Sequence, residues 1–520
     1  MLGSRKAENP IIWADVPDPS VIRVGDTYYM TSTTMHMNPG VPIMKSKDLV
    51  NWEIVNYVYD VLGDSDRQRL VKGQDEYGIG SWASSLRYHE GIYYVVFSSQ
   101  TAGKTFIFQT RDLEKGPWEM STIDFVHDMS LLFDDDGRVY LVYGGGDIRL
   151  LELTEDARAI KPGGLNQVII PDSSAIAGPD IALPAEGAHI HKIGGKYYIF
   201  LITWPRGGMR TQLCYRADQI TGPYEGRVVL QDAGIAQGGL IDTVDGKWHA
   251  LLFGDRGAVG RIPYLVPVSW EEGWPVLGIE GRVPRDPGIS VESSLKIVAS
   301  DDFENRGERI GAFHRVVGEA EENEYNGSNL SLVWQWNHNP DNRNWSLTER
   351  PGYLRLINGS VSKDILEARN ILTQRTFGPE CSAEVALEVS NMKNGDYAGL
   401  AAFQRNYGFV GVKMTEKGKS IIMVNAGSGT PVEVESIPFV GDRVYLKVEC
   451  DFLGQRDLAY FYYSLDGHHW HSIGNTLHMT YTMPHFMGYR FALFNYATIE
   501  TGGYVDFDYF RVTDKMTGTK

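Results

Sequence analysis

The chain has 520 residues, of which 42% are hydrophobic and 22% charged, enough material for two or three globular domains. Its formal net charge is −17 and it lacks stripes of Lys and Arg, so nucleic acid is not a predicted partner. No apolar run is long enough to span a bilayer, so no membrane contact is predicted either. The three cysteines are far apart and odd in number, which indicates neither a disulfide framework nor a cysteine metal site.

The first feature along the chain is an internal repeat. Five segments read as an apolar strand, a tight turn at glycine and a strand rich in Tyr or Trp; they turn at Gly25, Gly91, Gly137, Gly195 and Gly246. Glycine supplies the positive φ of a β-hairpin, and the spacing of roughly 45 to 65 residues suits four-stranded blades. The repeat therefore predicts a five-bladed β-propeller over residues 1–285.

The second region begins near residue 285, where the hairpin repeat stops. Residues 444–450, 458–465 and 504–512 alternate polar and apolar side chains at period two, as half-exposed sandwich strands do. Helical periodicity is weak along the whole chain, which leaves little room for a doubly wound or (β/α)8 fold. We therefore predict an all-β protein in which a β-sandwich over residues 286–520 follows the propeller.

Counting back from each hairpin glycine identifies the residue that begins each inner strand. Nine residues before the turn stand Trp82, Asp128, Glu186 and Gln237, and Asp18 stands seven before the first of the glycines. Because side chains alternate with period two, all five belong to one strand face, and the inner strands of a propeller converge on its axis. The register therefore predicts a ring of five residues around one central pocket.

Three of the five ring positions are acidic. A single carboxylate often caps a turn or pairs with a buried arginine, but three in one register raise one another's pKa, a cost that proteins accept where function needs it. Glycoside hydrolysis uses such a set, since one carboxylic acid protonates the leaving oxygen and one carboxylate activates water. Prolines on both sides hold Asp18 steady, and the glycine after Glu186 lets a ligand approach. Asp18, Asp128 and Glu186 are thus the candidate catalytic residues.

The motifs around these residues resemble those of glycoside hydrolase family 43, the inverting β-xylosidases and α-L-arabinofuranosidases. Asp18, in Asp-Pro-Ser before an apolar strand, is similar to the family's general base, and Asp128, before Met-Ser-Leu, to its pKa-tuning aspartate. Glu186 is similar to its general acid, although Ala188 replaces the usual proline of that motif. The resemblance implies single-displacement hydrolysis in which Asp18 activates water, Glu186 protonates the glycosidic oxygen and Asp128 tunes Glu186.

Further segments extend the resemblance over nearly the whole chain. Trp82 is similar to a tryptophan that lines the sugar pocket, and Arg261 to an arginine near the first sugar subsite. Residues 334–340 and 344–347 resemble the C-terminal sandwich of one xylosidase-like branch, which implies a concanavalin A-like fold. The resemblance implies an exo-acting enzyme that releases β-D-xylose, α-L-arabinofuranose or both from hemicellulose oligosaccharides such as xylan or arabinoxylan fragments.

Calcium is considered at two places. Gln237 stands where the family commonly has a histidine near a central metal ion or water; its amide oxygen suits Ca²⁺ with several waters, and a hydrogen bond to the catalytic acids fits equally well. Asp302 and Asp508 flank the first and last sandwich strands and are candidates for a second Ca²⁺. Neither ion would be a Lewis acid for the reaction, and no organic cofactor is predicted.

His189 and Met35 complete the predicted substrate contacts. His189 and His191 alternate with apolar residues beside Glu186, but two histidines on one strand face lack the third ligand of a zinc site. We therefore predict that His189 borders the pocket and that His191 is structural. Met35, in the loop after the first hairpin, is a candidate sugar contact.

Two other functions remain open. A fructan-type five-bladed hydrolase would carry Arg-Asp-Pro in its third blade and Glu-Cys at its acid, and these strings occur here only at residues 285–287 and 380–381. A non-catalytic carbohydrate-binding propeller would gain nothing from an acid and a base. The oligomeric state is left open, and the prediction is a bacterial protein of the cytoplasm, or of the periplasm or exterior if a signal peptide was removed.

Overall fold

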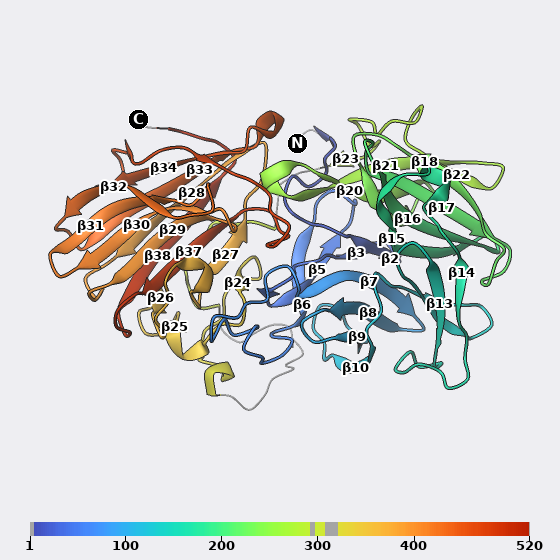
Figure 1. Cartoon of the computed structure of the whole chain (residues 1–520), viewed down its shortest axis with the longest axis horizontal. Helices are drawn as coiled ribbons and strands as arrows, with labels where there is room; N and C mark the ends of the chain where they lie inside the picture. The colour runs from blue at the N-terminus through green and yellow to red at the C-terminus, as the bar shows by residue number, and fades with distance from the viewer. Residues whose placement is uncertain (1–4, 292–296, 307–320, 519–520) are drawn as a thin grey trace.

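The computed structural model describes residues 5–291, 297–306 and 321–518 and is built almost entirely of β-strands. Figure 1 shows two bodies side by side, the N-terminal one in blue to green and the C-terminal one in yellow to red. Within the described residues, five four-stranded sheets form the first body and two eight-stranded sheets form the second. The predicted all-β fold, a five-bladed propeller followed by a sandwich, is therefore confirmed.

Each blade is an antiparallel sheet whose strands follow one another in chain order. Blade 1 contains β2 (Ser20–Val24), β3 (Thr27–Thr31), β5 (Gly40–Ser46) and β6 (Glu53–Tyr59). Blade 2 contains β7 (Ser81–His89), β8 (Ile92–Ser99), β9 (Lys104–Thr110) and β10 (Glu119–Asp124). Blade 3 contains β11 (Ser130–Phe133), β12 (Val139–Tyr143), β13 (Ile148–Leu153) and β14 (Asn166–Ile170).

The last two blades follow the same plan and close the ring. Blade 4 contains β15 (Ile181–Ile193), β16 (Lys196–Pro205), β17 (Thr211–Ala217) and β18 (Glu225–Leu230). Blade 5 contains β19 (Ala236–Asp242), β20 (Trp248–Asp255), β21 (Arg261–Glu271) and β22 (Trp274–Leu277). The first strands of successive blades are neighbours, and β19 lies beside β2. The five strand starts that carry the predicted ring therefore converge on one axis.

The hairpin glycines behave as their sequence pattern predicts. Gly137 and Gly246, for example, have φ of 85° and 80°, which an L side chain adopts only with strain. These turns join the first and second strands of blades 3 and 5. The repeated glycine thus sets where each inner strand ends, and with it the register of the residues that begin the strand.

The second body is a sandwich of two sheets. One sheet has the order β32 (Val432–Phe439), β31 (Gly418–Asn425), β30 (Gly408–Thr415), β29 (Asp396–Phe403), β37 (Arg490–Ala497), β27 (Leu372–Arg375), β24 (Gln335–Asn337) and β4 (Met37–Asn38). The other contains β25 (Trp345–Ser346), β26 (Leu354–Ile357), β38 (Tyr504–Thr513), β28 (Glu380–Glu388), β33 (Arg443–Asp451), β34 (Leu458–Ser464) and β35 (His471–Ser472), with β36 (Leu477–His478) beside β34. Alternate side chains such as Leu493 and Phe507 fill a dry core.

Short helices are confined to the connections. All are 3₁₀ turns of three residues: η1 (Ala175–Ala177), η2 (Gly257–Val259), η3 (Glu321–Asn323), η4 (Asn342–Asn344), η5 (Ile365–Glu367) and η6 (Leu453–Gln455). Among the described residues none of these helices has the length or apolarity needed to cross a bilayer. The predicted domain boundary near residue 285 falls between the end of β22 and β23 (Ser290–Val291), and its exact place stays a prediction.

The two bodies are joined by shared strands as well as by side chains. The two-residue strand β4 lies in the loop between β3 and β5 of blade 1, yet it pairs with β24 and extends a sandwich sheet. At the N-terminus, β1 (Arg5–Lys6) pairs with β23, just after the last blade. Because main-chain hydrogen bonds cross the junction, the sandwich is held in a fixed place against the propeller.

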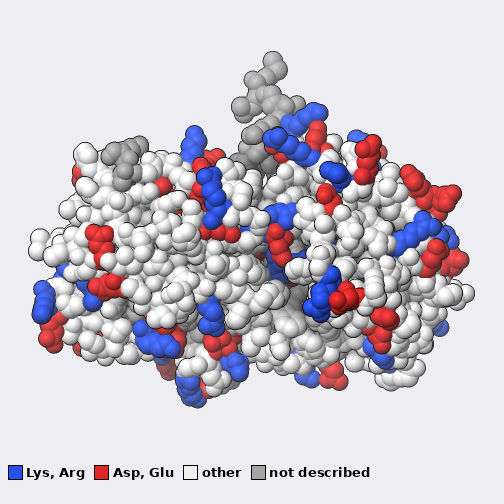
Figure 2. Space-filling model, turned by 45° about the horizontal axis from the view of Figure 1, so that its top comes forward, with Lys and Arg blue, Asp and Glu red and all other residues white. Residues whose placement is uncertain are grey.

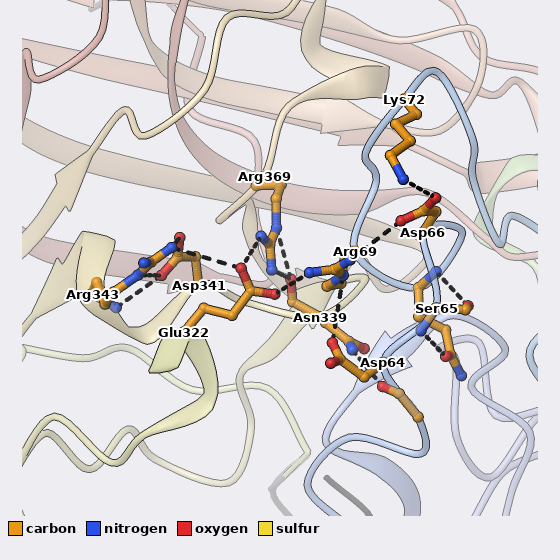
Figure 3. Close-up of polar contacts among 12 residues, drawn as sticks. Asp64, Ser65, Asp66, Arg69, Lys72, Glu322, Asn339, Asp341, Arg343 and Arg369 are labelled. Atoms are coloured by element: carbon orange, nitrogen blue, oxygen red, sulfur yellow. Dashed lines mark hydrogen bonds and ion pairs between the residues drawn. The ribbon is translucent and has the colours of Figure 1, made fainter. Parts of the chain in front are cut away.

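An ionic network strengthens the same junction. Figure 3 shows Arg69, from the loop between β6 and β7, reaching Glu322 of η3 at 3.3 Å, and Glu322 in turn contacting Arg369 at 3.3 Å. Arg69 also contacts Asp66 of its own loop at 3.2 Å. Arg343 also lies 3.7 Å from Glu322. The side chain of Glu322 is only 12% exposed, so its ion pairs with these three arginines are screened less than surface pairs would be.

Charged side chains elsewhere are distributed in small groups. On the face drawn in Figure 2, acidic and basic residues are interspersed and no continuous basic surface is visible. Many of them form exposed ion pairs, such as Lys47 with Asp26. Exposed pairs of this kind contribute little to stability, and they mark no binding surface by themselves.

Candidate active site

The predicted ring positions lie at irregular strand starts. Asp18 and Asp128 each stand two residues before an inner strand, β2 and β11 respectively. The other three lie inside β7, β15 and β19, where the pairing register shifts between Ser81 and Ser84, on both sides of Glu186, and between Ala236 and Gly239. Such bulges turn side chains out of the regular alternation, and they recur next to functional sites. Three blades therefore interrupt their ladder at the ring residue, and in the other two the ring residue precedes the ladder.

Backbone conformation marks the same positions. Asp18, Asp128 and Gln237 have φ of 52°, 45° and 64°, in the left-handed region that residues other than glycine rarely adopt. Each such residue costs of order 1–3 kcal/mol and persists only where the surrounding structure fixes it. Three of five ring residues carry this strain. The strain is therefore concentrated where a function has been predicted from the sequence.

The base side of the site consists of Asp18, Arg261 and Thr33. Asp18 Oδ2 accepts a hydrogen bond of 2.7 Å from Thr33 Oγ1, and Arg261 Nη1 lies 3.3 Å from Asp18 Oδ1. The side chains of Arg261 and Asp18 are only 5% and 7% exposed. Burial alone would lower the pKa of Arg261, but the carboxylate of Asp18 keeps it above its ordinary value. Asp18 thus faces a permanent cation.

The sandwich completes the base side. Phe486, in the segment before β37, lies under the guanidinium of Arg261, with 4.5 Å between the guanidinium carbon and the ring centre. The main chain of Arg261 is fixed by Asp15, whose Oδ1 accepts a hydrogen bond of 2.8 Å from the Arg261 N–H. The other oxygen of Asp15 accepts a hydrogen bond of 3.1 Å from the N–H of Gly488. One carboxylate therefore ties a propeller strand to the sandwich segment.

The acid side consists of His127, Asp128 and Glu186. His127 Nε2 lies 2.7 Å from Glu186 Oε2 and 3.5 Å from Asp128 Oδ2. Asp128 Oδ2 also accepts a hydrogen bond of 3.1 Å from the N–H of Gly187, the residue that follows Glu186. The side chains of His127 and Glu186 are 35% and 26% exposed, so this side is open to solvent. The side chain of Asp128 is 9% exposed, less than that of either neighbour.

The acid side holds exchangeable protons at neutral pH. Burial, reinforced by the charges of Glu186 and Asp18, raises the pKa of Asp128 to about 7. For His127, burial alone would lower the pKa, but the hydrogen bond to Glu186 and the charge of Asp128 raise it to about 9. The three groups are close enough to titrate together. A carboxylic acid and an imidazolium in one cluster can give a proton to a bound ligand.

The other predicted site residues surround this set. The indole ring of Trp82 lies 5.9 Å from the ring of His127, and Trp82 packs with Met35 in one apolar cluster. Met35 is 2% exposed. His189 is buried beside Gly239, and burial lowers its pKa to about 3. The Gln237 side chain lies against Gly187, where an added Cβ would come within 2.9 Å of its amide carbon. Their contact with substrate stays a prediction.

His191 has a structural partner. Its Nε2 accepts a hydrogen bond of 3.0 Å from the N–H of Leu240, which links blade 4 to blade 5. Close by, Arg87 extends from β7 and donates to the carbonyl oxygens of Leu131 and Ile190 at 2.8 and 3.0 Å. These contacts tie blades 2, 3 and 4 together near the axis. The polar groups of His191 and Arg87 therefore serve to hold neighbouring blades together.

Neither predicted calcium site presents a full set of protein ligands among the described residues. Ca²⁺ prefers six to eight oxygen ligands, whereas Gln237 offers one amide oxygen and its own N–H donates to Gln212 Oε1. Asp302 and Asp508 are not brought together, because Asp302 pairs with Arg511 and Asp508 with Arg443. Within the described part of the chain, the one group of three acidic, His or Cys ligands within 4.8 Å is His127, Asp128 and Glu186. These three residues lie close together because the imidazole of His127 contacts the carboxylate of Glu186 directly, at 2.7 Å, and no ion is needed to hold them there.

Two contributors were missed by sequence reasoning. His127 directly precedes Asp128, so its position was in view, but only the fold reveals that it reaches Glu186 across two blades. Phe486 lies more than two hundred residues after Arg261 in the chain, and no sequence pattern connects them. A histidine directly before a ring acid is the sequence signal that could have identified His127.

Comparison with protein families agrees with both bodies. Residues 7–275 match the model described as glycosyl hydrolases family 43, and residues 322–513 match the one described as beta xylosidase C-terminal concanavalin A-like domain. The concanavalin A-like character expected for the sandwich is thereby confirmed. The two matches together cover the propeller and most of the second body.

Individual relatives are similar over most of the chain. A beta-xylosidase of Formosa agariphila is 29% identical over 96% of this chain and 89% of its own length. A non-reducing end alpha-L-arabinofuranosidase of Bacteroides ovatus is 26% identical over 81% of this chain and 78% of its own. Among solved structures, a bifunctional GH43-CE protein of Bacteroides eggerthii is 56% identical, with a TM-score of 0.93 over 99% of this chain. The present chain spans 64% of that protein's length.

Proposed function

The chain belongs to glycosyl hydrolases family 43 and is a glycoside hydrolase, and from that premise we propose that it releases terminal pentoses from hemicellulose oligosaccharides with inversion. The observation that carries the proposal is the division of the site into two sides. One side presents a carboxylate to a fixed cation, and the other presents a carboxyl group within a proton-holding cluster. A base that activates water and an acid that protonates the leaving oxygen need this pair of environments.

Each carboxylate has one role in the proposed reaction. Asp18 accepts the proton of the attacking water, and its contacts with Thr33 and Arg261 fix its orientation. Glu186 donates a proton to the glycosidic oxygen. Asp128 positions Glu186, because it holds the main chain beside it through the N–H of Gly187.

The sugar is proposed to be β-D-xylose, α-L-arabinofuranose or both. Relatives named beta-xylosidase and alpha-L-arabinofuranosidase each align with more than three quarters of the length of this chain. Trp82 supplies an aromatic face next to the acid side, and such faces suit the apolar face of a sugar ring. Xylan or arabinoxylan fragments are therefore the proposed source, and action at chain ends is the proposed mode.

The fructan alternative loses its support. Its two diagnostic strings lie outside the propeller ring. Arg285 follows the last blade, where it forms an exposed ion pair with Glu8, and Glu380 begins β28 of the sandwich. A purely binding propeller is not favoured either, since the chain belongs to a family of hydrolases. The carboxylates at three inner strands remain available for catalysis.

Calcium at Gln237 remains a proposal separate from the mechanism. Gln237 would offer its amide oxygen, and water would supply most of the remaining ligands. The ion would add positive charge near the acid side, and no catalytic step depends on it. Treatment with EDTA followed by added Ca²⁺ tests it through the melting temperature and through activity.

The reaction is tested with p-nitrophenyl β-D-xyloside and p-nitrophenyl α-L-arabinofuranoside, followed by proton NMR. Inversion predicts that α-xylose appears first from the β-xyloside. First release of β-xylose contradicts inversion, and failure to cleave either glycoside contradicts the pentose assignment. Asp26→Asn is a matched control, because Asp26 lies in the hairpin of the same blade as Asp18 but is exposed and pairs with Lys47. This variant should keep full activity.

A further inference from the structure

Two arginines stand opposite each other inside the junction between the propeller and the sandwich. Arg375 ends β27 and Arg490 begins β37, and the two are direct partners in this antiparallel pair. Each residue is only 1% exposed. Like charges directly opposite on neighbouring strands repel each other, and burial removes the water that would screen them.

The hydrogen-bond donors of the pair are mostly unused. Arg375 Nε donates to the carbonyl oxygen of Asp15 at 2.9 Å, and Arg490 Nη1 donates to Thr373 Oγ1 at 3.3 Å. The remaining nitrogens, Nη1 and Nη2 of Arg375 and Nε and Nη2 of Arg490, are buried and have no partner within the described structure. Buried guanidinium nitrogens without an acceptor are costly, so four in one place call for a ligand.

The surrounding charges do not balance the pair. The charge of Asp15 acts on both arginines, and its two oxygens already accept from the N–H groups of Arg261 and Gly488. Asp18 is paired with Arg261. Among the described residues, three buried guanidinium groups therefore face two buried carboxylates, and one positive charge is left over.

The neutral neighbours cannot supply the negative charge that would balance the pair. The pKa of Tyr57 is raised by burial to about 12, and its hydroxyl donates to the carbonyl oxygen of Leu332 at 2.6 Å. His36 and His485 also lie in the field of Arg490, and burial lowers the pKa of both. Burial likewise lowers the pKa of Arg490, to about 9, so its positive charge is still present at neutral pH.

We propose that Arg375 and Arg490 together bind a small monovalent anion, of the size and charge of chloride, at the junction of the two bodies. One negative charge matches the one uncompensated positive charge, whereas a divalent oxyanion would reverse the imbalance. The anion accepts from the free guanidinium nitrogens of both strands. It thereby neutralises the excess positive charge of the β27–β37 strand pair. This strand pair is hydrogen-bonded to Asp15 through Arg375, and Asp15 in turn binds the main-chain N–H of Arg261.

The anion is tested first by thermal unfolding of the whole protein. Melting temperatures are compared in sodium chloride and in sodium gluconate at equal ionic strength, because gluconate is too large for the site. Chloride should raise the Tm in a saturable way, by roughly 1–3 °C at ten times its Kd. Equal melting temperatures in the two salts would overturn the proposal.

A matched pair of variants locates the effect. Arg490→Gln should abolish the difference between chloride and gluconate. Arg511→Gln should keep it, because Arg511 belongs to the same sandwich but forms an exposed ion pair with Asp302. An unchanged chloride response in Arg490→Gln contradicts the assignment to this pair.

A direct measurement needs no variant and covers the case in which Arg490→Gln does not fold. Wild-type crystals soaked in bromide should show an anomalous scattering peak between the guanidinium groups of Arg375 and Arg490. A water molecule would satisfy the same donors but give no peak. Bromide peaks on the surface alone therefore overturn the proposal.

Discussion

Compared with the acid side of the active site, the base side is drier and is built from both bodies of the molecule. Asp18 and Arg261 are 7% and 5% exposed, whereas Glu186 and His127 are 26% and 35% exposed. On the base side a guanidinium fixes the charge, and the sandwich covers it through Phe486. On the acid side protons exchange within a cluster open to solvent. In the proposed reaction, this difference separates a fixed base from an acid that must be reprotonated in every cycle.

The largest expected effect separates the two sides by leaving group. Asp18→Asn and Glu186→Gln should each lower kcat on natural xylo-oligosaccharides by about three powers of ten or more. With a dinitrophenyl glycoside, whose leaving group needs no proton, Glu186→Gln should recover much of the lost rate and Asp18→Asn should not. Steady-state kinetics on both substrates measures this contrast. Equal recovery in the two variants would show that the roles are wrongly assigned.

The buried ion pair of the base side predicts a large loss of stability. Arg261→Met leaves the carboxylate of Asp18 buried without its cation, which should lower the free energy of unfolding by about 3–5 kcal/mol. The loss should be smaller when Asp18→Asn is already present, because no charge is then stranded. Unfolding curves for the two single variants and the double variant measure the coupling. Additive losses would contradict a coupled pair.

The contribution of the sandwich to the base side is expected to be smaller. Phe486→Ala removes the ring that covers the Arg261 guanidinium, so water should reach the ion pair and weaken its hold on Asp18. We expect kcat/KM to fall by about tenfold. Phe439→Ala, a buried ring near the far edge of the sandwich, is the matched control for lost packing. A similar fall in the control would assign the effect to domain stability.

The smallest expected effect is a displacement of the pH profile on the acid side. The positive charge of His127 lowers the pKa of Asp128, so His127→Asn should raise the pKa of Asp128 above about 7. The alkaline limb of kcat/KM should therefore move to higher pH, by about one unit. His469→Asn, an exposed histidine paired with Asp466, is the control. An unchanged limb, or one moved to lower pH, contradicts the role of His127.

The pH dependence of folding stability is a second test of the role of His127. The pKa of His127 is raised from its ordinary value of 6.5 to about 9, so its stabilising contribution is complete below pH 6.5 and is lost as the pH rises to about 9. Over that window the melting temperature of the wild type should fall more steeply than that of His127→Asn. Parallel curves would indicate that His127 gains no partner on folding.

Local sequence patterns predicted much of this protein because they act within one blade. The hairpin glycines fix five turns, and counting back from them along the sequence leads to Asp18, Asp128 and Glu186. The sandwich strands were recognised from their period-two alternation. Both signals depend on backbone conformation and burial along a single strand, which neighbouring residues largely determine.

Contacts between distant segments escaped prediction. The sequence placed Asp302 and Asp508 at the two ends of the sandwich and suggested a shared ion, but each aspartate has its own arginine. It gave no role to His127, although that residue stands beside a predicted acid. The bulges and positive φ at the ring positions were also unforeseen, because they arise where five strands crowd around one axis.

The sequence by itself determined the strands, the five-fold repeat and which residues begin the inner strands, since these follow from turn chemistry and side-chain periodicity. Only the tertiary structure decided which side of the site is dry, which residues share protons and how the sandwich reaches the base. Burial and charge pairing depend on distances between segments far apart in the chain. For the same reason, the facing arginines of β27 and β37 became visible only in the folded protein.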